Sequence, residues 1–554
     1  MADGPLLEID SLTFRYRRAT EPAIRDLSLT VGHGEVLLVA GPSGCGKSTL
    51  IRAINGLIPH SYRGELGGRV ALDGRSVAES RLRDLAEIVG TVLQDPRKQL
   101  VGSTIAGELA FGPENLGIPR DVIRDRLEAV LEATGLRYLR DRTTDQLSGG
   151  ESQQLAIAGA LMLEPRLLVL DEPLANLDPL SAHRLVEMVR QLADGGTAVV
   201  IVEHRVEDVL DARPDQVLYL EDGATRYFGP MEGFLAIADP ASVKVPFAVS
   251  LARARVAADI AAPAALLAPA THPAVQAPRL EWRGVDAGYD GRVVLHGITS
   301  GLGRNERVAV LGPNGSGKTT LFKAAIGLIP LVAGEVAVDG RPTLGRSVAD
   351  LAAIFGYVFQ NPSQMLFAPT VEHEILFGPR NMGRDPERFA GLVADSLGRV
   401  GLAAEHEIRD RPPLTLSFGQ QKRLAIAVAL ALEPRTLVLD EPSAGQDHRS
   451  ATAFMEEVGR IEGLESVYYV THDADLALAH ADRILLMRDG RIVADGAPLD
   501  VIADRERWAD CNLRYTSLME ANARWGSRTG RFLAADELSR WVVRQDLEGG
   551  LEIT

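Results

Sequence analysis

The sequence contains the same phosphate-binding loop twice, and this repeat constrains the fold more than any other feature. Residues Gly41 to Ser48 read GPSGCGKS and residues Gly312 to Thr319 read GPNGSGKT, so both match G-x-x-x-x-G-K-[ST]. Each loop follows an apolar, strand-like run, at 36–40 and 308–311, and each opens a helix-like segment. In that context, backbone N–H groups and a helix N-terminus surround phosphate oxygens. The pattern therefore predicts two phosphate sites, each between a strand and a helix.

Each loop predicts a set of contacts to a nucleoside triphosphate and Mg²⁺. Lys47 and Lys318 are expected to reach the outer phosphates, and Ser48 and Thr319 are expected to hold Mg²⁺. The other loop residues expected to contact the nucleotide are Gly41, Pro42, Ser43, Gly44, Cys45, Gly46, Thr49, Gly312, Pro313, Asn314, Gly315, Ser316, Gly317 and Thr320. A helix N-terminus lowers a thiol pKa, so Cys45 is either reactive until nucleotide covers it or a small residue buried for fit.

Length and composition limit the class of protein. A chain of 554 residues predicts two to four domains, and 46% hydrophobic with 24% charged residues is a globular composition. The formal charge of −16 argues against nucleic-acid binding by the surface as a whole, since such binding needs a basic face, and leaves a local basic groove open. No secretory signal is recognised at the start, and no run reaches the ~18 apolar residues of a membrane span. Two distant cysteines, Cys45 and Cys511, fit a reducing cytoplasm. Work at a membrane would require docking onto another chain.

Landmarks beyond the loops recur along the chain at a near-constant offset. The matched pairs, with their offsets, are Gln94 and Gln360 (266), Ser148 and Ser417 (269), Asp171 and Asp440 (269), and His204 and His472 (268). Two copies of one folded domain are the simplest explanation. We place them at residues 5–235 and 278–500, with an Ala/Pro-rich linker at 236–277 and a C-terminal extension at 501–554. In the linker, a short helix is expected at 251–262 before prolines end it.

Apolar runs alternate with amphipathic helical stretches in both copies. The clearest strand-like runs are 167–170, 198–202, 437–439 and 467–470. Near-continuous apolar strands that alternate with helices indicate a buried, largely parallel sheet. The extension is expected to be a small helical element whose tryptophans, Trp508, Trp525 and Trp541, pack on the second copy; a partner-binding tail is the alternative.

Two matched strands end in Asp-Glu-Pro, at 171–173 and 440–442. A carboxylate at the end of a buried strand beside a phosphate loop suits Mg²⁺, and this role is predicted for Asp171 and Asp440. The adjacent Glu172 and Glu441 are predicted to orient a water molecule for in-line attack on the γ-phosphate.

A histidine and a glutamine also end apolar strands in each copy. His204 and His472 are predicted to donate a hydrogen bond to the γ-phosphate, and Gln94 and Gln360 to contact Mg²⁺ or the attacking water. The alternatives are a structural histidine and a solvated glutamine, and the matched positions in both copies favour the functional interpretation.

A second helix-opening motif precedes each Asp-Glu strand. It reads Leu-Ser-Gly-Gly-Glu at 147–151 and Leu-Ser-Phe-Gly-Gln at 416–420. A Ser-Gly helix N-terminus can bind phosphate through N–H groups and the helix dipole. Because each copy already has a phosphate loop, the economical interpretation is that this motif caps the nucleotide held by the other copy.

Taken in this order, the motifs resemble the nucleotide-binding domain of ATP-binding-cassette (ABC) proteins over roughly residues 1–500. The resemblance implies an α/β fold with two tandem P-loop NTPase domains, mostly parallel sheet cores and helical subdomains, plus the small C-terminal helical extension. It implies an ATPase that closes two cassettes head-to-tail around two ATP molecules.

The resemblance also assigns residues to two composite ATP sites. Site one would combine Lys47, Ser48, Gln94, Asp171, Glu172 and His204 with Ser417, Gly419 and Gln420. Site two would combine Lys318, Thr319, Gln360, Asp440, Glu441 and His472 with Ser148, Gly149 and Gly150. Tyr16 and Tyr289 stand where the family stacks an aromatic ring on adenine, with a core tyrosine as the alternative. Asp178 and Asp447 match the acidic end of the interface loop. Both sites are expected to hydrolyse ATP, and Phe418 and Gln446, which depart from the usual glycine and leucine, leave equal rates open.

The segments after each glutamine, 94–117 and 360–383, resemble those of energy-coupling-factor (ECF) importer ATPases. This implies uptake of a vitamin or transition-metal ion, with a transmembrane T component and a separate substrate-capture membrane protein as partners. It places the chain at the cytoplasmic face of the cell membrane. Glu108 or Glu374 would accept an arginine from a partner helix, or would simply be a solvated first-turn acid.

Three other classes with related cassettes stay open. Sugar-importer ATPases usually have one degraded catalytic site and a different segment after the glutamine. Ribosome-acting ABC proteins have a long charged helical linker, which 240–278 is not. DNA-repair ABC ATPases need a coiled-coil or zinc insertion, and the sequence contains neither.

Overall fold

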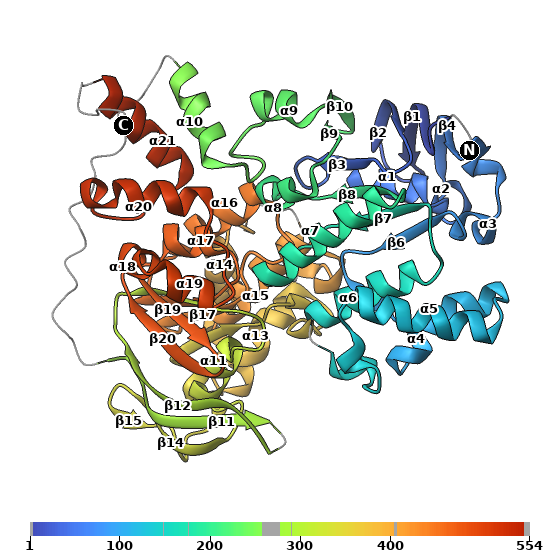
Figure 1. Ribbon diagram of the computed structural model, residues 1–554. Coiled ribbons are helices and arrows are strands. Elements are labelled where there is room, and N and C mark those ends of the chain that lie inside the picture. The colour runs from blue at the N-terminus through green and yellow to red at the C-terminus, as the bar shows by residue number, and fades with distance from the viewer. Residues whose placement is uncertain are drawn as a thin grey trace. The chain divides into compact units, whose positions relative to one another are not determined.

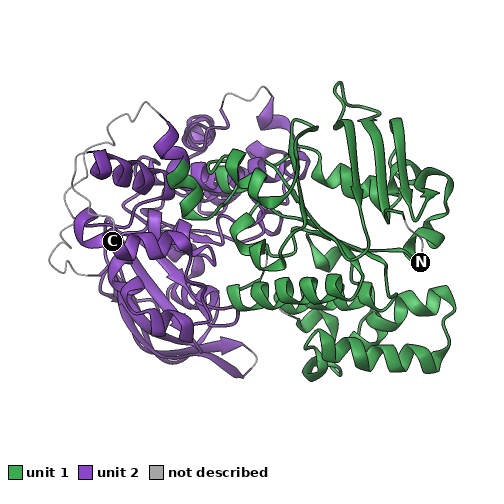
Figure 2. Cartoon of the chain, turned by 45° about the horizontal axis from the view of Figure 1, so that its top comes forward, with its two compact units in different colours: residues 1–252, 447–449 green, residues 253–446, 450–554 purple. Residues whose placement is uncertain are grey.

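The computed structural model describes residues 4–147, 149–175, 177–257, 278–289, 291–403 and 407–547. The chain forms two compact units, which we call unit 1 (residues 1–252 and 447–449) and unit 2 (residues 253–446 and 450–554). Figure 1 gives the elements, and Figure 2 colours the two units. Each unit is described by itself below.

Unit 1 is built on one ten-stranded sheet, in the order β5-β4-β1-β2-β10-β9-β3-β8-β7-β6. Its strands are β1 Leu7–Tyr16, β2 Ile24–Val31, β3 Val36–Ala40, β4 Gly64–Leu72, β5 Arg75–Ser76, β6 Val89–Val92, β7 Leu167–Asp171, β8 Ala198–Val202, β9 Gln216–Glu221 and β10 Ala224–Gly229. Its helices are α1 Lys47–Ile54, α2 Leu57–His60, α3 Leu82–Ala86, α4 Ile105–Leu116, α5 Arg120–Ala133, α6 Gly149–Leu161, α7 Pro179–Asp194, α8 Val206–Val209 and α9 Met231–Ile237.

The core of unit 1 is a parallel run of strands, β9-β3-β8-β7-β6. These strands are apolar at nearly every position because both of their faces are buried. The pairing of Val202 with both Val39 and Asp171 brings the carboxyl ends of β3, β7 and β8 to one edge of the sheet. The loop after β3 and the acids after β7 therefore start from neighbouring points.

Unit 2 repeats this plan with two sheets, in the orders β12-β11-β14-β15 and β16-β17-β18-β13-β19-β20. Its strands are β11 Leu280–Tyr289, β12 Arg292–Leu302, β13 Arg307–Leu311, β14 Leu331–Val338, β15 Arg341–Pro342, β16 Phe355–Val358, β17 Thr436–Asp440, β18 Ser466–Val470, β19 Arg483–Arg488 and β20 Arg491–Gly496. Its helices up to the extension are α11 Lys318–Ala325, α12 Val348–Ala352, α13 Val371–Asn381, α14 Phe389–Arg399, α15 Phe418–Leu430, α16 His448–Gly459 and α17 Ala474–His480.

The strands β16, β17, β18, β13 and β19 of unit 2 are also parallel neighbours. Val470 pairs with Val310 and with Asp440, so the second loop and the second pair of acids start from one edge, as in unit 1. The prediction of α/β domains with mostly parallel sheet cores is confirmed. The strand-like runs that the sequence indicated coincide with β3, β7, β8, β13, β17 and β18 to within one residue at each end.

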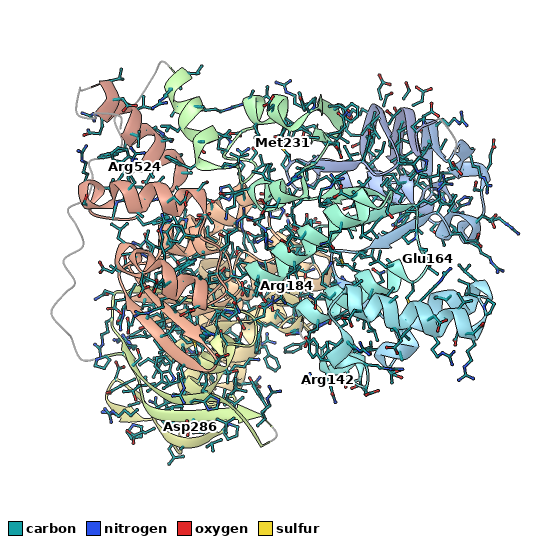
Figure 3. All side chains as sticks on the ribbon, viewed as in Figure 1. Arg142, Glu164, Arg184, Met231, Asp286 and Arg524 are labelled. Carbon is teal, nitrogen blue, oxygen red and sulfur yellow. The ribbon has the colours of Figure 1, made fainter. Side chains whose placement is uncertain are left out.

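The C-terminal extension is helical and belongs to unit 2, as α18 Pro498–Ala503, α19 Arg505–Asp510, α20 Ser517–Thr529 and α21 Ala535–Leu547. Trp508 is fully buried, and Trp541 is buried with its ring centroid 6.1 Å from that of Trp525. Trp525 is half-buried, and the guanidinium of Arg524, which Figure 3 labels, lies 4.9 Å from its ring centroid. Residues 548–554 lie outside the described part.

The helix expected at 251–262 is displaced toward the N-terminus. Helix α10 runs over Phe247–Val256, and positions 258–262 of the expected helix lie outside the described residues. The displacement has a packing cause, because Val243 and Val245 are buried in the core of unit 1 and Phe247 is buried at the start of the helix. Residues up to 252 thus pack with unit 1. The domain boundaries 5–235 and 278–500 stay a prediction.

Among the described residues, no helix is both long enough and apolar enough to cross a membrane.

Candidate active sites

Both phosphate loops depend on glycine for two separate reasons. A Cβ at Gly41 would lie 2.4 Å from the Leu220 carbonyl oxygen, so the loop passes too close to β9 for a side chain. Gly44 has a left-handed backbone (φ +81°) and open space where a Cβ would project. Gly312 and Gly315 repeat both features in unit 2. The loops therefore have the shape that admits a phosphate against backbone N–H groups.

The two loop lysines occupy the same position in their units. Lys47 Nζ donates to the carbonyl oxygens of Gly41 (2.7 Å) and Pro42 (2.9 Å). Lys318 Nζ likewise donates to Gly312 (2.8 Å) and Pro313 (2.9 Å). Both lysines are 7% exposed. Each ammonium thus lies inside its own loop, at the place where the predicted outer phosphates would replace the carbonyl contacts.

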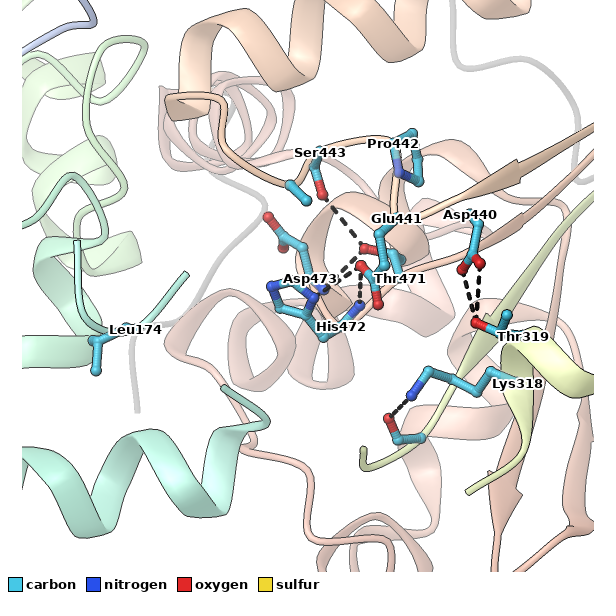
Figure 4. A network of polar contacts seen from close by, with 12 residues as sticks. Leu174, Lys318, Thr319, Asp440, Glu441, Pro442, Ser443, Thr471, His472 and Asp473 are labelled. Carbon is cyan, nitrogen blue, oxygen red and sulfur yellow. Dashed lines mark hydrogen bonds and ion pairs between the residues drawn. The ribbon is translucent and has the colours of Figure 1, made fainter. Parts of the chain in front are cut away.

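Two of the three predicted magnesium ligands of unit 2, Thr319 and Asp440, are in direct contact, as Figure 4 shows. Thr319 Oγ1 donates to the Asp440 carboxylate, with distances of 2.9 and 3.0 Å to its two oxygens. Tyr357 on β16 donates to the same carboxylate (3.0 Å). Burial raises the pKa of Asp440, and the negative charge of Glu441 adds to the effect. A hydroxyl beside a carboxylate is a donor set that fits Mg²⁺, provided phosphate oxygens and water complete the shell. In the described ranges no group of three His, Cys, Asp or Glu side chains could hold a metal ion without such help.

In unit 1, the matched carboxylate has a strongly shifted pKa. Burial raises the pKa of Asp171 to about 6; Lys47 opposes this shift and the nearby Glu203 carboxylate adds to it. The protein therefore holds an acid that is poorly solvated when ionised. A cation bound at this position would relieve that cost, which fits the predicted role of Asp171.

We expect Asp171→Asn to stabilise nucleotide-free unit 1 in a pH-dependent way. Because the folded pKa is raised above the ordinary value, Asp171 costs no stability at low pH and becomes costly as pH rises from about 4 through about 6. Urea unfolding at pH 8 should show a gain of ~1 kcal/mol or more for the variant, and at pH 5 a smaller gain. A gain that is the same at both pH values would contradict the assignment of the shift to Asp171.

Glu172 and Glu441 share an unusual backbone. Both have a left-handed conformation, with φ of 45° and 50°, which costs about 1 kcal/mol or more for a residue other than glycine. Their N–H groups still donate to the ends of the neighbouring strands, Glu172 to Val202 (2.9 Å) and Glu441 to Val470 (2.8 Å). The sheet ladder thus continues to the glutamate, and the chain turns out of the sheet there. The two units thus place these glutamates at matched points of their sheet edges.

The two glutamates have different partners. In unit 1, the Gln94 amide donates to Glu172 (2.5 Å). In unit 2, His472 Nδ1 lies 2.8 Å from Glu441 Oε2, and the His472 N–H donates to the same oxygen (3.2 Å). Burial raises the pKa of Glu172, with His204 opposing. Burial acts in the same direction on Glu441, but His472 and Lys318 hold the pKa of Glu441 below its usual value.

Glu203 is a site residue that the sequence analysis did not single out. It is fully buried, its Oε1 lies 3.4 Å from His204 Nδ1, and its Oε2 has no hydrogen-bond partner among the described residues. Unit 2 has Thr471 at this position, whose hydroxyl accepts the Asp473 N–H (3.1 Å). The sequence contained a signal for this difference between the two units, since an acid precedes one histidine and a threonine precedes the other. His204 therefore pairs with an additional acid, whereas His472 pairs with the predicted catalytic one.

The helices that follow the two Leu-Ser motifs are α6 and α15. Ser148 lies outside the described residues, and α6 begins at Gly149, with Gly150 buried. Ser417 caps α15 reciprocally with Gln420: the Gln420 N–H donates to the serine hydroxyl (3.3 Å), and the Ser417 N–H donates to the glutamine side chain (2.9 Å). Ser417 and Gly419 are exposed, as a cap for a nucleotide held elsewhere requires.

The two tyrosines predicted to stack on adenine differ. Tyr16 is half-buried, and its hydroxyl contacts Thr49 (3.1 Å) and accepts a hydrogen bond from Arg52 (2.7 Å). Tyr289 is 42% exposed at the end of β11. Adenine stacking stays a prediction for both, and the Tyr16 contacts favour a structural contribution as well.

The interface-loop acids are both placed at helix starts. Asp178 caps α7 by accepting the Ser181 N–H (3.0 Å). Asp447, which is part of unit 1, accepts the Ser43 N–H of the first phosphate loop (2.8 Å).

Of the two interpretations of Cys45, a reactive thiol and a small buried residue, the structure supports the buried residue. It is 3% exposed, and burial raises the pKa of its thiol although Lys47 acts to lower it. Desolvation therefore outweighs the helix N-terminus that favoured a reactive thiolate.

The acids after each glutamine bond to their own backbone. Glu108 Oε2 accepts the N–H groups of Val101 (2.8 Å) and Gly102 (2.5 Å). Glu374 Oε2 accepts those of Phe367 and Ala368 (both 2.7 Å), and Glu374 is 1% exposed. The prediction that the Glu374 carboxylate accepts an arginine from a partner helix is wrong, because this carboxylate is buried under the loop that it orders. Neither is it a solvated first-turn acid.

Comparisons with known proteins show which family the chain belongs to. The family model described as "ABC transporter" matches residues 24–175 and 295–444. A Methanosarcina acetivorans protein, provisionally named as an ABC transporter ATP-binding protein, is 35% identical over 91% of this chain and 88% of its own. A protein of Streptococcus pneumoniae with the same name is 34% identical over 93% of this chain and 94% of its own. A solved structure of cbiO1 from Clostridium perfringens, described as part of the ABC transporter complex cbiONQ, is 33% identical over 43% of this chain and 95% of its own, with a TM-score of 0.38.

The family model matches the chain twice, and each match contains one complete phosphate loop and one Asp-Glu strand. The relatives are similar along nearly the whole chain. The chain belongs to the ABC transporter family and is an ABC transporter ATPase with two cassettes.

Proposed function

We propose that this chain energises an ECF-type importer for a vitamin or a transition-metal ion. It would act at the cytoplasmic face of the cell membrane, held there by a transmembrane T-type component that works with a separate substrate-capture membrane protein. The observation that carries the docking part of the proposal is a pair of exposed apolar side chains at matched positions after each glutamine.

In unit 1 these side chains are Val101 (67% exposed) and Phe111 (47%), and in unit 2 they are Phe367 (63%) and Phe377 (49%). The rings of Phe367 and Phe377 pack edge to face, with centroids 4.8 Å apart. Glu108 and Glu374 each fix the loop that carries the first side chain of the pair. Exposed apolar side chains of this kind are suited to the apolar face of a partner helix.

In the catalytic part of the proposal, each ATP lies between the loop of one cassette and the Leu-Ser helix of the other. Lys47 and Lys318 would turn from their loop carbonyls to the outer phosphates. Glu172 and Glu441 would each hold the attacking water and take its proton. Mg²⁺, when bound by Ser48, Gln94 and Asp171 or by Thr319, Gln360 and Asp440, would neutralise phosphate charge. His204 and His472 would contact the γ-phosphate, so that closure depends on the bound nucleotide.

Photo-crosslinking in native membranes tests the docking. We expect a crosslinker at Phe111 or Phe377 to capture an integral membrane protein, and one at the exposed Leu344 (91%), as the control position, to capture none. Phe111→Glu with Phe377→Glu should reduce co-purification with the membrane partner by roughly tenfold or more, since buried aromatic anchors dominate interfaces. Two unlike membrane partners, one of which retains a vitamin or metal ion, would support an ECF importer. Capture of ribosomes, or of two like permease subunits, would overturn it.

A further inference from the structure

We propose that Lys422 and Phe418 are positioning residues that hold the loop after Asp440-Glu441 against the start of α15. This couples the loop of one catalytic centre to the helix N-terminus that would cap the other nucleotide. The inference rests on the proposed composite sites and adds a route by which one site affects the other.

Lys422 joins the two segments directly. It is 4% exposed, and its Nζ donates to the carbonyl oxygens of Pro442 (2.7 Å) and Ala444 (2.6 Å). These carbonyls belong to the loop that immediately follows Glu441. Hydrogen bonds from a charged donor in a buried place are among the stronger ones in a protein. The loop is therefore held by a side chain from the second turn of α15.

Phe418 adds a second contact between the same segments. Its ring lies one helical turn from Lys422, with the ammonium 5.2 Å from the ring centroid. A Cβ on Gly445 would lie 3.1 Å from this ring, and Gly445 has a left-handed backbone (φ +69°). The ring thus lies close against the loop where only glycine is well accommodated. Phe418 and Lys422 both differ from the residues at the matched positions of the first copy, and both contact the same short loop.

The described residues at the matched positions of unit 1 form no equivalent of this pair. The matched positions, at the offset of 269, are Gly149 and Gln153. Gly149 has no side chain, and Gln153 is 1% exposed with its Nε2 lacking a hydrogen-bond partner among the described residues. The link is thus specific to the second copy, which predicts that the two ATP sites are not equivalent.

Burial of the Lys422 ammonium is energetically unfavourable. Burial lowers the pKa of Lys422 to about 7, and the negative charge of Glu441 opposes this shift. Removing the ammonium alone would leave the carbonyl oxygens of Pro442 and Ala444 without this donor, which is also unfavourable. The two contacts to the loop therefore offset the cost of burying Lys422.

The test uses Lys422→Met in the full chain, with Arg423→Met as the matched control. Arg423 is the next residue on α15 and pairs with Glu457 (3.2 Å) on a more exposed face. We expect Lys422→Met to lower kcat for ATP roughly tenfold, because a small misplacement near the chemistry is costly. The KM for ATP should change less than about threefold, since no ATP contact is removed. The Tm should fall, because the carbonyl oxygens of Pro442 and Ala444 lose their donor, and Arg423→Met should leave kcat unchanged.

Coupling is tested by repeating the measurement in two backgrounds. With Glu172→Gln, turnover reports the Glu441 site, and with Glu441→Gln it reports the Glu172 site. A loss of turnover from Lys422→Met in both backgrounds supports the link through α15. A loss confined to the Glu172→Gln background, or a wild-type kcat for Lys422→Met, overturns it. Should the methionine variant fail to fold, Lys422→Gln, which places the unit 1 residue in unit 2, is measured against the same expectations.

The failure of this inference differs from the failure of the proposed function. If Glu441→Gln lowers turnover and Lys422→Met does not, only the positioning role is lost. If neither glutamate variant lowers turnover, the composite catalytic sites themselves are wrong.

Discussion

Replacing both Glu172 and Glu441 with glutamine should lower ATP turnover by ~10²–10⁴-fold and trap an ATP-loaded state. Glutamine keeps the size of the side chain and loses the carboxylate that is proposed to take the proton of the attacking water. Steady-state phosphate release and retention of radiolabelled ATP after rapid desalting would measure the two effects. Each single variant should lower turnover less than the pair does.

The matched control is Glu456→Gln, which changes a surface acid paired with Arg460 (3.2 Å). This control should hydrolyse ATP at the wild-type rate. Near-normal hydrolysis by the double variant would rule out these glutamates as the bases. Because Glu441 contacts His472 whereas Glu172 contacts Gln94, the two single variants should also differ from each other.

Replacing Lys47 or Lys318 with methionine should remove one ATP site and spare the other. Each ammonium is held inside its loop by two carbonyl oxygens and is proposed to move to the outer phosphates. Losing a charged hydrogen bond to phosphate should weaken ATP binding at that site roughly 10- to 100-fold. Calorimetry in the Glu172→Gln, Glu441→Gln background should then show one tight site per chain instead of two.

The two lysine variants serve as controls for one another, since each leaves the other loop intact. The double variant should lose both tight sites. Two tight sites in either single variant would contradict the assignment of that loop. Loss of both sites from one substitution would instead show that the cassettes bind ATP only together.

The motifs of this chain could be recognised from the sequence because they depend on local chemistry. A loop such as 41–48 needs glycine where the backbone meets β9 and where it faces a phosphate, so the residue types reveal the conformation. The parallel strands are apolar on both faces, which made β3, β8 and their partners in the second copy recognisable. The same local arguments could not locate helix α10, because its start depends on packing against unit 1.

The sequence by itself determined that there are two cassettes, which strands form their cores and which acids end those strands. Only the tertiary structure decided the surroundings of particular side chains: the pairing of Glu203 with His204, the buried state of Glu374, the raised pKa of Cys45 and the contacts of Lys422. The physical reason is that burial and pairing arise between residues far apart in the chain. A periodic pattern or a short motif does not record the surroundings of a side chain.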